Sequence, residues 1–250
     1  MNTPALEVSD VVVRFGGLTA LDKVSMQVHP AEVVGLIGPN GAGKTTLLNV
    51  ITGLIRPSAG TLRIGGQACG RRPTHWRARR GISRTFQRVG LFPELTVDQH
   101  LQLATEARGR ARKHPAGPAS HQDDLETVRR QVGLEIPGSA WTGGLPLGTA
   151  RLVELAMAIA AGPHVLLLDE PFSGLVGAER RHMSDLLCSL RDQRGVGVIL
   201  VEHDIDSVAR LVDRIVVLDF GRKIADGNPA DVLSDSLVRT AYFGQKGVAV

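Results

Sequence analysis

The stretch Gly38-Pro39-Asn40-Gly41-Ala42-Gly43-Lys44-Thr45-Thr46 decides the fold of this 250-residue chain. Its spacing, G-x-x-x-x-G-K-[ST], is typical of a loop that binds phosphate groups. The apolar run at 33–37 before it predicts a short buried strand, and residues 45–54 after it carry the apolar spacing of a helix. A strand, a glycine-rich loop and a helix in this order predict an α/β fold that binds a nucleotide at the loop.

The residue types in this loop match the chemistry of phosphate binding. Glycines let backbone N–H groups turn toward phosphate oxygens, and the N-terminus of the following helix adds positive potential there. Lys44 is expected to place its ammonium against the β- and γ-phosphates, and Thr45 to give its hydroxyl to Mg²⁺. The loop residues from Gly38 to Thr46 are therefore the candidate nucleotide-binding residues.

The composition is typical of a single cytoplasmic α/β domain that spans residues 1–250, of which 43% are hydrophobic and 22% charged. Two distant cysteines, Cys69 and Cys188, have no metal-type spacing and indicate a reducing compartment. No apolar run approaches the roughly 18 to 20 residues of a spanning helix. The N-terminus lacks the basic start and apolar core of a signal peptide.

Seven arginines lie close together in the sequence, and the net charge of the chain is +4. They are Arg71, Arg72, Arg77, Arg79, Arg80, Arg84 and Arg88. A nucleic-acid site and a solvated face are the two interpretations. No aromatic interleaving is expected to accompany the arginines, so a base-stacking surface is disfavoured and a solvated face is expected, where some of them could also meet a membrane-embedded partner.

A second candidate site lies at the end of a buried strand. The apolar run Val165 to Leu168 predicts an interior parallel strand, and Asp169 and Glu170 follow it directly. Ligands of parallel sheets gather at the carboxyl ends of the strands. Asp169 is expected to hold Mg²⁺ through its water shell, and Glu170 to polarise the attacking water.

Two further residues carry both a structural and a functional interpretation. His203 follows the apolar strand at 198–201, where an imidazole can reach a γ-phosphate, although a lone histidine is more often structural. Phe15 precedes a Gly-Gly turn, where it is either a core residue or a ring that stacks on adenine.

The rest of the chain is organised around these sites. Short strands are predicted within 5–30, at 61–66 and at 82–87, and a strand pair is predicted at 215–225. Residues 88–160 are expected to form a helical subdomain with a helix at 94–108 and a mobile loop at 108–120. A C-terminal tail, 228–250, is predicted to begin with a short helical segment from 229 to about 242.

These features, in this order, resemble the nucleotide-binding subunits of ATP-binding cassette (ABC) transporters over residues 5 to 245. The resemblance implies a P-loop NTPase fold of ABC type, with a mainly parallel sheet core, an antiparallel N-terminal β subdomain and a helical subdomain. It implies ATP and Mg²⁺ as ligands, and hydrolysis of ATP coupled to solute transport.

The resemblance also gives roles to single residues. It implies that Phe15 stacks on adenine and that Gln87 senses Mg²⁺ and the membrane permease. Asp169 matches the Walker B aspartate, Glu170 the catalytic glutamate and His203 the switch histidine.

Several segments are similar to the branched-chain amino acid uptake group, and within it to the LivG type of ATPase subunit rather than the LivF type. They are residues 14–18, 84–87, 91–97, 220–227 and 241–244. Relatives for urea and short amides share much of this pattern, so the solute stays open. The resemblance implies partners as well: a second cassette subunit, two membrane permease subunits and, indirectly, an extracytoplasmic solute-binding protein. The chain is expected at the inner face of the membrane, with no nucleic acid bound, although a non-transport ABC ATPase remains the alternative.

Two segments depart from the family pattern. The signature loop L-S-G-G-Q reads Leu145-Pro146-Leu147-Gly148-Thr149, and the loop S-G-L-D ends in Val176. Gly148 and the following helix, expected from 150 to 161, still offer backbone donors to an anion. Both segments act on the partner's ATP in this family. We therefore expect an asymmetric heterodimer in which this chain's own phosphate loop forms the hydrolytic site.

The expected docking site for a permease helix is a groove between Gln87 and Leu103, with Leu91 and Phe92 exposed beside it.

Overall fold

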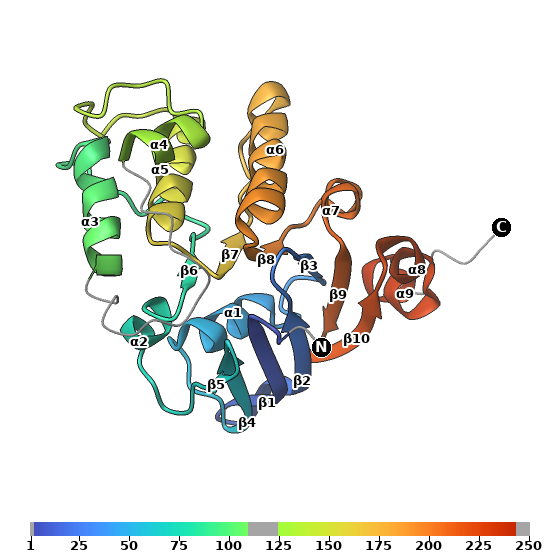
Figure 1. Ribbon diagram of the computed structural model, residues 1–250. Coiled ribbons are helices and arrows are strands. Elements are labelled where there is room, and N and C mark those ends of the chain that lie inside the picture. Colours follow the sequence, from blue (N-terminus) through green and yellow to red (C-terminus); the bar gives the residue numbers. More distant parts are fainter. Residues whose placement is uncertain (1–2, 110–124, 244–250) are drawn as a thin grey trace.

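The computed structural model describes residues 3–109 and 125–243, which form two sheets and a set of helices (Figure 1). The larger sheet has the strand order β10-β9-β3-β8-β7-β6, and the smaller sheet has the order β2-β1-β4-β5. Five neighbouring strands of the larger sheet are parallel, and β10 is antiparallel at its edge. The smaller sheet is antiparallel throughout. The predicted fold class is therefore confirmed.

The strands are β1 (Leu6–Phe15), β2 (Leu18–Val28), β3 (Val33–Ile37), β4 (Ala59–Ile64), β5 (Gln67–Ala68), β6 (Ile82–Arg84), β7 (Val165–Asp169), β8 (Gly197–Val201), β9 (Arg214–Asp219) and β10 (Arg222–Gly227). The helices are α1 (Lys44–Thr52), α2 (Thr74–Ala78), α3 (Val97–Gly109), α4 (Leu125–Gln131), α5 (Leu147–Ala160), α6 (Gly177–Arg194), α7 (Ile205–Leu211), α8 (Pro229–Ser234) and α9 (Ser236–Phe243). None of these helices is long and apolar enough to cross a membrane.

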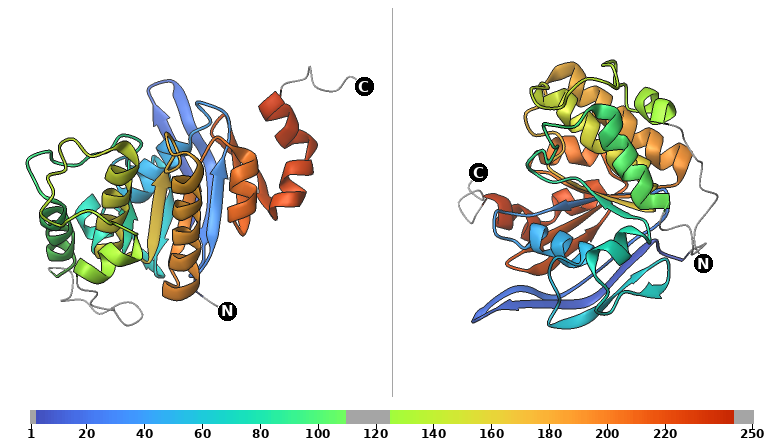
Figure 2. Two further views of the ribbon diagram at one scale, coloured as in Figure 1. Left: turned by 90° about the horizontal axis from the view of Figure 1, so that it is seen from above. Right: turned by 90° about the vertical axis from the view of Figure 1, so that its left-hand side faces the viewer.

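The central strands β3, β7 and β8 of the larger sheet are buried on both faces, which explains why they are continuously apolar. Every residue of β3 is buried, and successive side chains enter different cores. Val33 and Ile37 pack in the cluster that contains α5 and α6, whereas Val34 and Leu36 pack in the cluster that contains α1 and the smaller sheet. Figures 1 and 2 show these layers on the two sides of the larger sheet. The carboxyl ends of β3, β7 and β8 consequently meet along one edge.

Helices α3, α4 and α5 lie together beside β6, within the range predicted for a helical subdomain (Figures 1 and 2). Val97 and Leu101 of α3, Val128 of α4 and Val153 of α5 share one buried cluster. The loop predicted at 108–120 falls almost wholly outside the described residues, and Arg108 and Gly109 belong to α3.

Several predicted boundaries were wrong because tertiary contacts decide them. Helix α1 ends at Thr52, so Leu54 lies beyond it and is 56% exposed. Strand β6 ends at Arg84, where its pairing with β7 stops, so Gln87 lies in a loop. The tail forms two short helices, because Asp235 is extended between α8 and α9. Residues 244–250 lie outside the described part.

The helix expected at 150–161 begins at Leu147, with Pro146 as its N-cap residue. Proline fixes φ and lacks an N–H group, so it fits the start of a helix, where N–H groups have no intrahelical partner. The docking expectation also needs a correction, because Leu91 is partly buried against the core. Phe92 is exposed, as predicted, and Leu103 is exposed as well.

The expectation of a solvated face fails for two of the seven arginines. Arg77 is 3% exposed and donates from Nη1 to the carbonyls of Val50 (2.5 Å) and Ile51 (2.9 Å) at the end of α1. Burial lowers the pKa of Arg77. Arg84 is also buried and forms an ion pair with Asp169. Arg77 therefore stabilises the end of α1, and Arg84 holds a residue of the candidate site.

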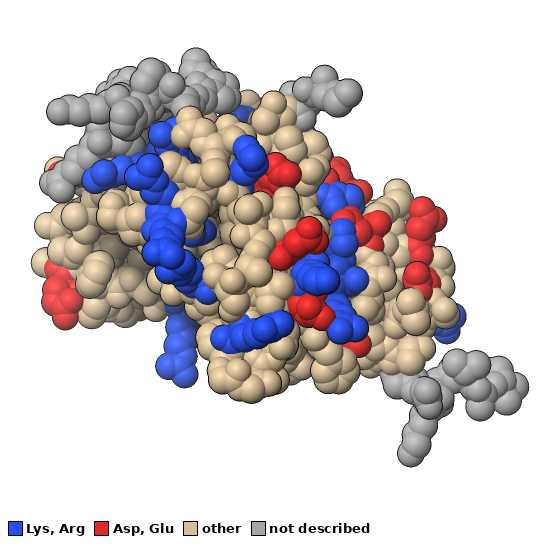
Figure 3. All heavy atoms as spheres, turned by 90° about the horizontal axis from the view of Figure 1, so that it is seen from below, with Lys and Arg blue, Asp and Glu red and all other residues tan. Residues whose placement is uncertain are grey.

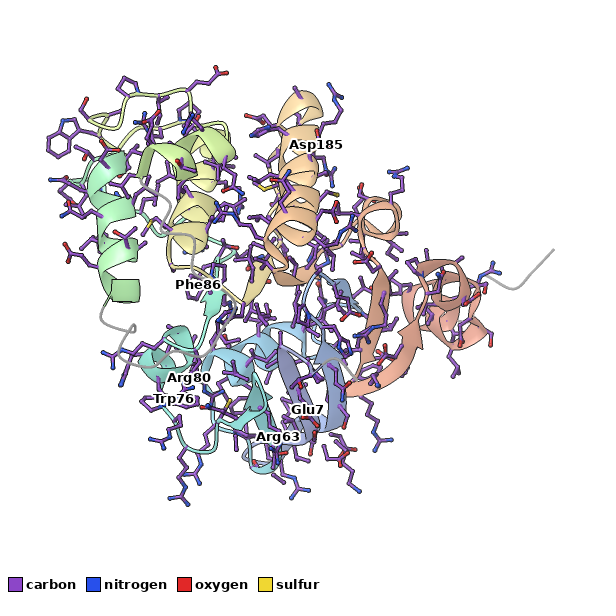
Figure 4. The ribbon with its side chains drawn as sticks, in the orientation of Figure 1. Glu7, Arg63, Trp76, Arg80, Phe86 and Asp185 are labelled. Atoms are coloured by element: carbon purple, nitrogen blue, oxygen red, sulfur yellow. The ribbon has the colours of Figure 1, made fainter. Side chains whose placement is uncertain are left out.

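Two of the remaining arginines, Arg72 and Arg80, lie over the ring of Trp76, so the expectation that no aromatic side chain accompanies the arginines was wrong. The guanidinium carbons of Arg72 and Arg80 lie 5.4 Å and 5.1 Å from the centroid of the Trp76 ring, and Figure 4 shows Trp76 and Arg80 side by side. Seen from below, Lys and Arg side chains extend across the surface with Asp and Glu among them (Figure 3). The surface on this side is therefore mixed in charge.

Candidate nucleotide site

The loop from Gly38 to Gly43 forms a backbone cradle that requires glycine at two positions. Gly43, the N-cap residue of α1, has φ 103°, and a Cβ atom there would lie 2.8 Å from the Ala20 carbonyl oxygen. At Gly38, a Cβ atom would lie 2.1 Å from the Leu218 carbonyl oxygen. Side chains are thus excluded at the two positions where β2 and β9 contact the loop. The space inside the loop remains open to the phosphates of a ligand.

Lys44 is the first residue of α1, and its ammonium bends back over the loop. It is 7% exposed, and its Nζ donates to the carbonyl oxygens of Gly38 (2.6 Å) and Pro39 (3.0 Å). Burial lowers the pKa of Lys44, while the negative charges of Glu170 and Asp169 oppose that shift. The ammonium therefore lies within electrostatic reach of both carboxylates.

The next two residues of α1, Thr45 and Thr46, are exposed and half-buried respectively, so the Thr45 side chain is accessible to a ligand. Asp169 supplies a carboxylate, and a hydroxyl with a carboxylate is the oxygen-rich ligand set that Mg²⁺ uses beside phosphates. Residues 3–109 and 125–243 contain no cluster of three or more His, Cys, Asp or Glu side chains suited to a metal. Such a cluster is not needed, because Mg²⁺ in nucleotide sites takes most of its ligands from phosphates and water.

Asp169 ends β7, where it is 4% exposed. Its Oδ2 accepts a hydrogen bond from Nη2 of Arg84 at 2.9 Å, and the side chains of both partners are almost fully buried. The Nη1 group of Arg84 donates to Oδ1 of Asn49 on α1 at 2.6 Å. Asp169 is thereby linked to the helix that carries Lys44 and Thr45.

Glu170 adopts a left-handed backbone conformation with φ 54°, which is uncommon for a residue with a side chain. Its N–H donates to the Val201 carbonyl at 2.9 Å, which fixes the turn to the end of β8. Oε2 accepts a hydrogen bond from Nε2 of Gln87 (3.0 Å), and Oε1 lies 2.7 Å from Nε2 of His203, which donates in the tautomer that this contact requires. The structure thus brings together three of the predicted residues.

We call Lys44, Gln87, Asp169, Glu170 and His203 the cis cluster. Phe15 and Gly148 are not part of this hydrogen-bonded cluster; they lie at the end of β1 and in α5. Phe15 ends β1 and is 49% exposed, which leaves one ring face accessible. Gly148 lies in the first turn of α5. Adenine stacking by Phe15 stays a prediction.

Glu202 is a site residue that the sequence analysis missed. It is 5% exposed, and its carboxylate accepts hydrogen bonds from the N–H groups of Phe172 (2.9 Å) and His203 (3.3 Å). Burial raises its pKa, and the two backbone donors oppose that shift. Glu202 therefore ties the loop after Glu170 to the strand end that carries His203. The signal that could have identified Glu202 is its position directly after four apolar strand residues.

The two loops that depart from the family pattern lie against one another. A Cβ atom on Gly174 would be 2.6 Å from Cδ2 of Leu147, which places the signature segment directly on the loop after β7. Leu147 is 48% exposed and Val176, the N-cap residue of α6, is 74% exposed. We call Pro146, Leu147, Gly148, Gly174 and Val176 the signature face.

The comparisons with known proteins agree with this geometry. Residues 21–173 match the model of the family described as ABC transporter. The chain is 38% identical to the high-affinity branched-chain amino acid transport ATP-binding protein BraF of Pseudomonas aeruginosa, over 98% of this chain and 100% of BraF. It is 36% identical, with the same coverage, to the protein LivG of Escherichia coli K12, whose name has the same description.

Among solved structures, the chain is similar to MJ1267, an ATP-binding cassette of an ABC transporter in its ADP conformation. The TM-score is 0.84 and the identity 27%, over 97% of this chain and 99% of that one. The chain belongs to the ABC transporter family, as one of its ATP-hydrolysing cassettes.

Proposed function

We propose that this chain is the ATP-hydrolysing subunit of an importer for branched-chain amino acids. The observation that carries the catalytic part is the position of Glu170 between Gln87 and His203, close enough to Lys44 to affect its pKa. The names of BraF and LivG support the choice of solute. In this proposal the chain works at the cytoplasmic face of the membrane on two permease subunits, beside a LivF-like second cassette.

The residues of the cis cluster divide the chemistry between them. Lys44 binds the β- and γ-phosphates, and Thr45 and Asp169 would hold Mg²⁺, which neutralises charge on the phosphate oxygens when bound. Glu170 orients the attacking water and accepts its proton as the water oxygen bonds to the γ-phosphorus and the bond to the β-phosphate oxygen breaks. Each carboxylate oxygen of Glu170 keeps a lone pair for that water, because each accepts only one hydrogen bond from a side chain.

His203 and Gln87 hold the catalytic carboxylate from two directions. His203 follows β8 and Gln87 lies in the loop after β6, so Glu170 responds to movement of either segment. We infer that Gln87 connects the site to the permease, because its loop leads to the exposed Phe92. Docking of a permease helix there would shift Gln87 and change the hydrogen bonding of Glu170.

The signature face supports an asymmetric pair of ATP sites. In the proposed dimer it would cover the ATP of the second cassette, where Pro146 and Val176 supply neither the hydroxyl nor the carboxylate of the family pattern. The second cassette, with a standard signature, would complete the site built on Lys44. Hydrolysis would then occur mainly at this chain's own phosphate loop.

The decisive experiment measures ATP turnover by this chain alone and after mixing with its second cassette. We expect turnover only in the mixture, and we expect it to disappear with Glu170→Gln in this chain. Cooperative turnover by the isolated chain would instead support a homodimer.

Reconstitution with the permeases and the binding protein then separates the candidate solutes. Stimulation of turnover by leucine, isoleucine or valine supports the proposal. Stimulation of turnover by urea or a short amide would assign the chain to the related group of transporters for those solutes. Turnover that no permease changes would support a non-transport ATPase.

A further inference from the structure

We propose that Arg84 positions the Asp169 carboxylate for Mg²⁺ and thereby sets the metal affinity of the site. This inference rests on the proposed function, in which Asp169 and Thr45 hold the metal. Arg84 ends β6, which lies three strands away from β3, the strand before the phosphate loop, in the sheet order. It is part of the segment 84–87 that resembles the uptake group, but the resemblance assigns it no role. Its side chain contacts the two elements, α1 and β7, that carry the proposed metal ligands.

The hydrogen bond from Arg84 occupies one oxygen of Asp169 and leaves the other available. Nη2 donates to Oδ2 at 2.9 Å, and Oδ1 makes no hydrogen bond with any described residue. Oδ1 is also not among the buried polar atoms without a partner, so it keeps contact with solvent. A carboxylate held by one oxygen has a fixed orientation, and the free oxygen can bind a metal ion or its water shell.

The same guanidinium connects the two elements that carry the metal ligands. Nη1 donates to Oδ1 of Asn49 at 2.6 Å, and Asn49 lies one helical turn beyond Thr45 on α1. Thr45 and Asp169 come from different parts of the chain, and their separation decides whether both can reach one small ion. Arg84 contacts both α1 and β7, so it fixes that separation.

The burial of this ion pair argues for a positioning role more than for stability. The side chains of Arg84 and Asp169 are 5% and 6% exposed. Removing two such charges from water offsets most of their attraction, so buried pairs are weak sources of stability. The Nε group of Arg84 is also buried without a hydrogen-bond partner. An unpaired buried donor lowers stability, so a contribution to stability alone does not explain the position of Arg84.

The guanidinium of Arg84 lies over the ring of Phe86. The guanidinium carbon lies 5.0 Å from the centroid of the Phe86 ring, and Phe86 is 50% exposed just after β6 (Figure 4). The planar guanidinium can stack on this ring while it donates in two directions. A lysine, with a single ammonium, cannot do both.

The test titrates Mn²⁺ into the full chain at saturating AMP-PNP and follows the EPR spectrum of protein-bound Mn²⁺. The affinity for AMP-PNP in EDTA is measured in parallel. Arg84→Met is expected to weaken Mn²⁺ binding about tenfold or more, as changes behind metal ligands do, while metal-free nucleotide affinity stays within about twofold. Arg84→Lys is expected to lie between Arg84→Met and the natural protein. The exposed residue Arg79 gives the matched control, Arg79→Met, with unchanged Mn²⁺ affinity.

The outcomes separate this inference from the proposed function. Mn²⁺ affinity within twofold of the natural protein in Arg84→Met would overturn the inference alone, provided that Glu170→Gln still abolishes turnover. Equal loss of Mn²⁺ affinity and metal-free nucleotide affinity would also overturn it, because it would indicate general damage to the site. A natural protein that binds no nucleotide would overturn both. If Arg84→Met does not fold, Arg84→Lys carries the test, with at least threefold weaker Mn²⁺ binding expected from the loss of one of its two hydrogen bonds.

Discussion

The cis cluster and the signature face belong to the same cassette but differ in chemistry. In the cis cluster, Gln87, Glu170 and His203 are joined by hydrogen bonds, and Lys44 lies above the phosphate loop. On the signature face, Leu147 packs against the loop at Gly174, and the exposed side chain of Val176 is apolar. Under the proposed function, this difference would let the chain hydrolyse its own nucleotide while it offers a partner's nucleotide few polar contacts.

The strongest test of the cis cluster is Glu170→Gln. An amide keeps the size of the side chain but cannot accept the proton of water, so turnover of the heterodimer should fall about 10²- to 10⁴-fold. ATP affinity should change little. Steady-state phosphate release and equilibrium ATP binding measure the two effects, with the exposed Glu126→Gln as a matched control. Turnover within threefold of the natural protein would remove Glu170 from its proposed role.

Lys44→Ala should have the next largest effect, and on binding. The ammonium forms charge-assisted hydrogen bonds, each worth about 1.5–3 kcal/mol, so ATP affinity should fall about 10- to 150-fold. Calorimetric titration of ATP measures this loss. The control is Arg56→Ala, which removes an exposed positive charge outside the loop. Unchanged ATP affinity in Lys44→Ala would show that the phosphates bind elsewhere.

The signature face can be changed toward the family pattern with Pro146→Ser, Thr149→Gln and Val176→Asp. If polar contacts to the partner's nucleotide limit the second site, its single-turnover rate should rise about tenfold. This is less than the 10²- to 10³-fold that one well-placed donor can supply, because the surrounding loops stay unchanged. Rapid-quench measurements with one site blocked by a catalytic-glutamate variant measure each rate. Equal rates at the two sites of the natural heterodimer would contradict the asymmetry itself.

The smallest expected effect concerns pH and Glu202. Burial raises the pKa of Glu202 in the folded chain, so the folded state binds its proton more tightly than the unfolded state. Its contribution to the free energy of unfolding is present below the ordinary glutamate pKa and is lost as the pH rises through the raised value. Glu202→Gln should remove this loss between pH 5 and pH 8, as measured by urea unfolding at both values. The exposed Glu135→Gln should leave the pH dependence unchanged.

The sequence predicted those parts of the site that depend on local chain order. The phosphate loop and the Asp169-Glu170 pair each follow an apolar strand, and parallel strands bring their carboxyl ends to one edge without further information. Gln87 was expected in the site only through the family resemblance, which also decided between the two interpretations of His203. Their hydrogen bonds to Glu170 depend on tertiary structure, which sequence spacing does not specify.

The wrong predictions for Arg84 and Arg77 also arise from tertiary contacts. Arg84 and Arg77 have the composition of a surface segment, yet both are buried because Asp169 and the end of α1 supply their partners. Helix α5 begins at Leu147, earlier than the apolar pattern indicated, with Pro146 as its N-cap residue. For the two arginines the deciding partner lies outside the window that a sequence pattern covers, whereas the start of α5 was marked by the adjacent Pro146.

The left-handed backbone of Glu170 also limits which substitutions evolution can sample at that position. With φ 54°, a glycine or an asparagine fits the backbone at little cost, whereas valine or isoleucine would be strained by its branched Cβ. Among fully randomised codons, the folded variants should therefore be dominated by small and amide residues. Under the role proposed for Glu170, loss of catalysis and loss of folding are thus separable at residue 170, and a lineage would silence hydrolysis by a single base-pair change to glycine while it keeps an intact cassette.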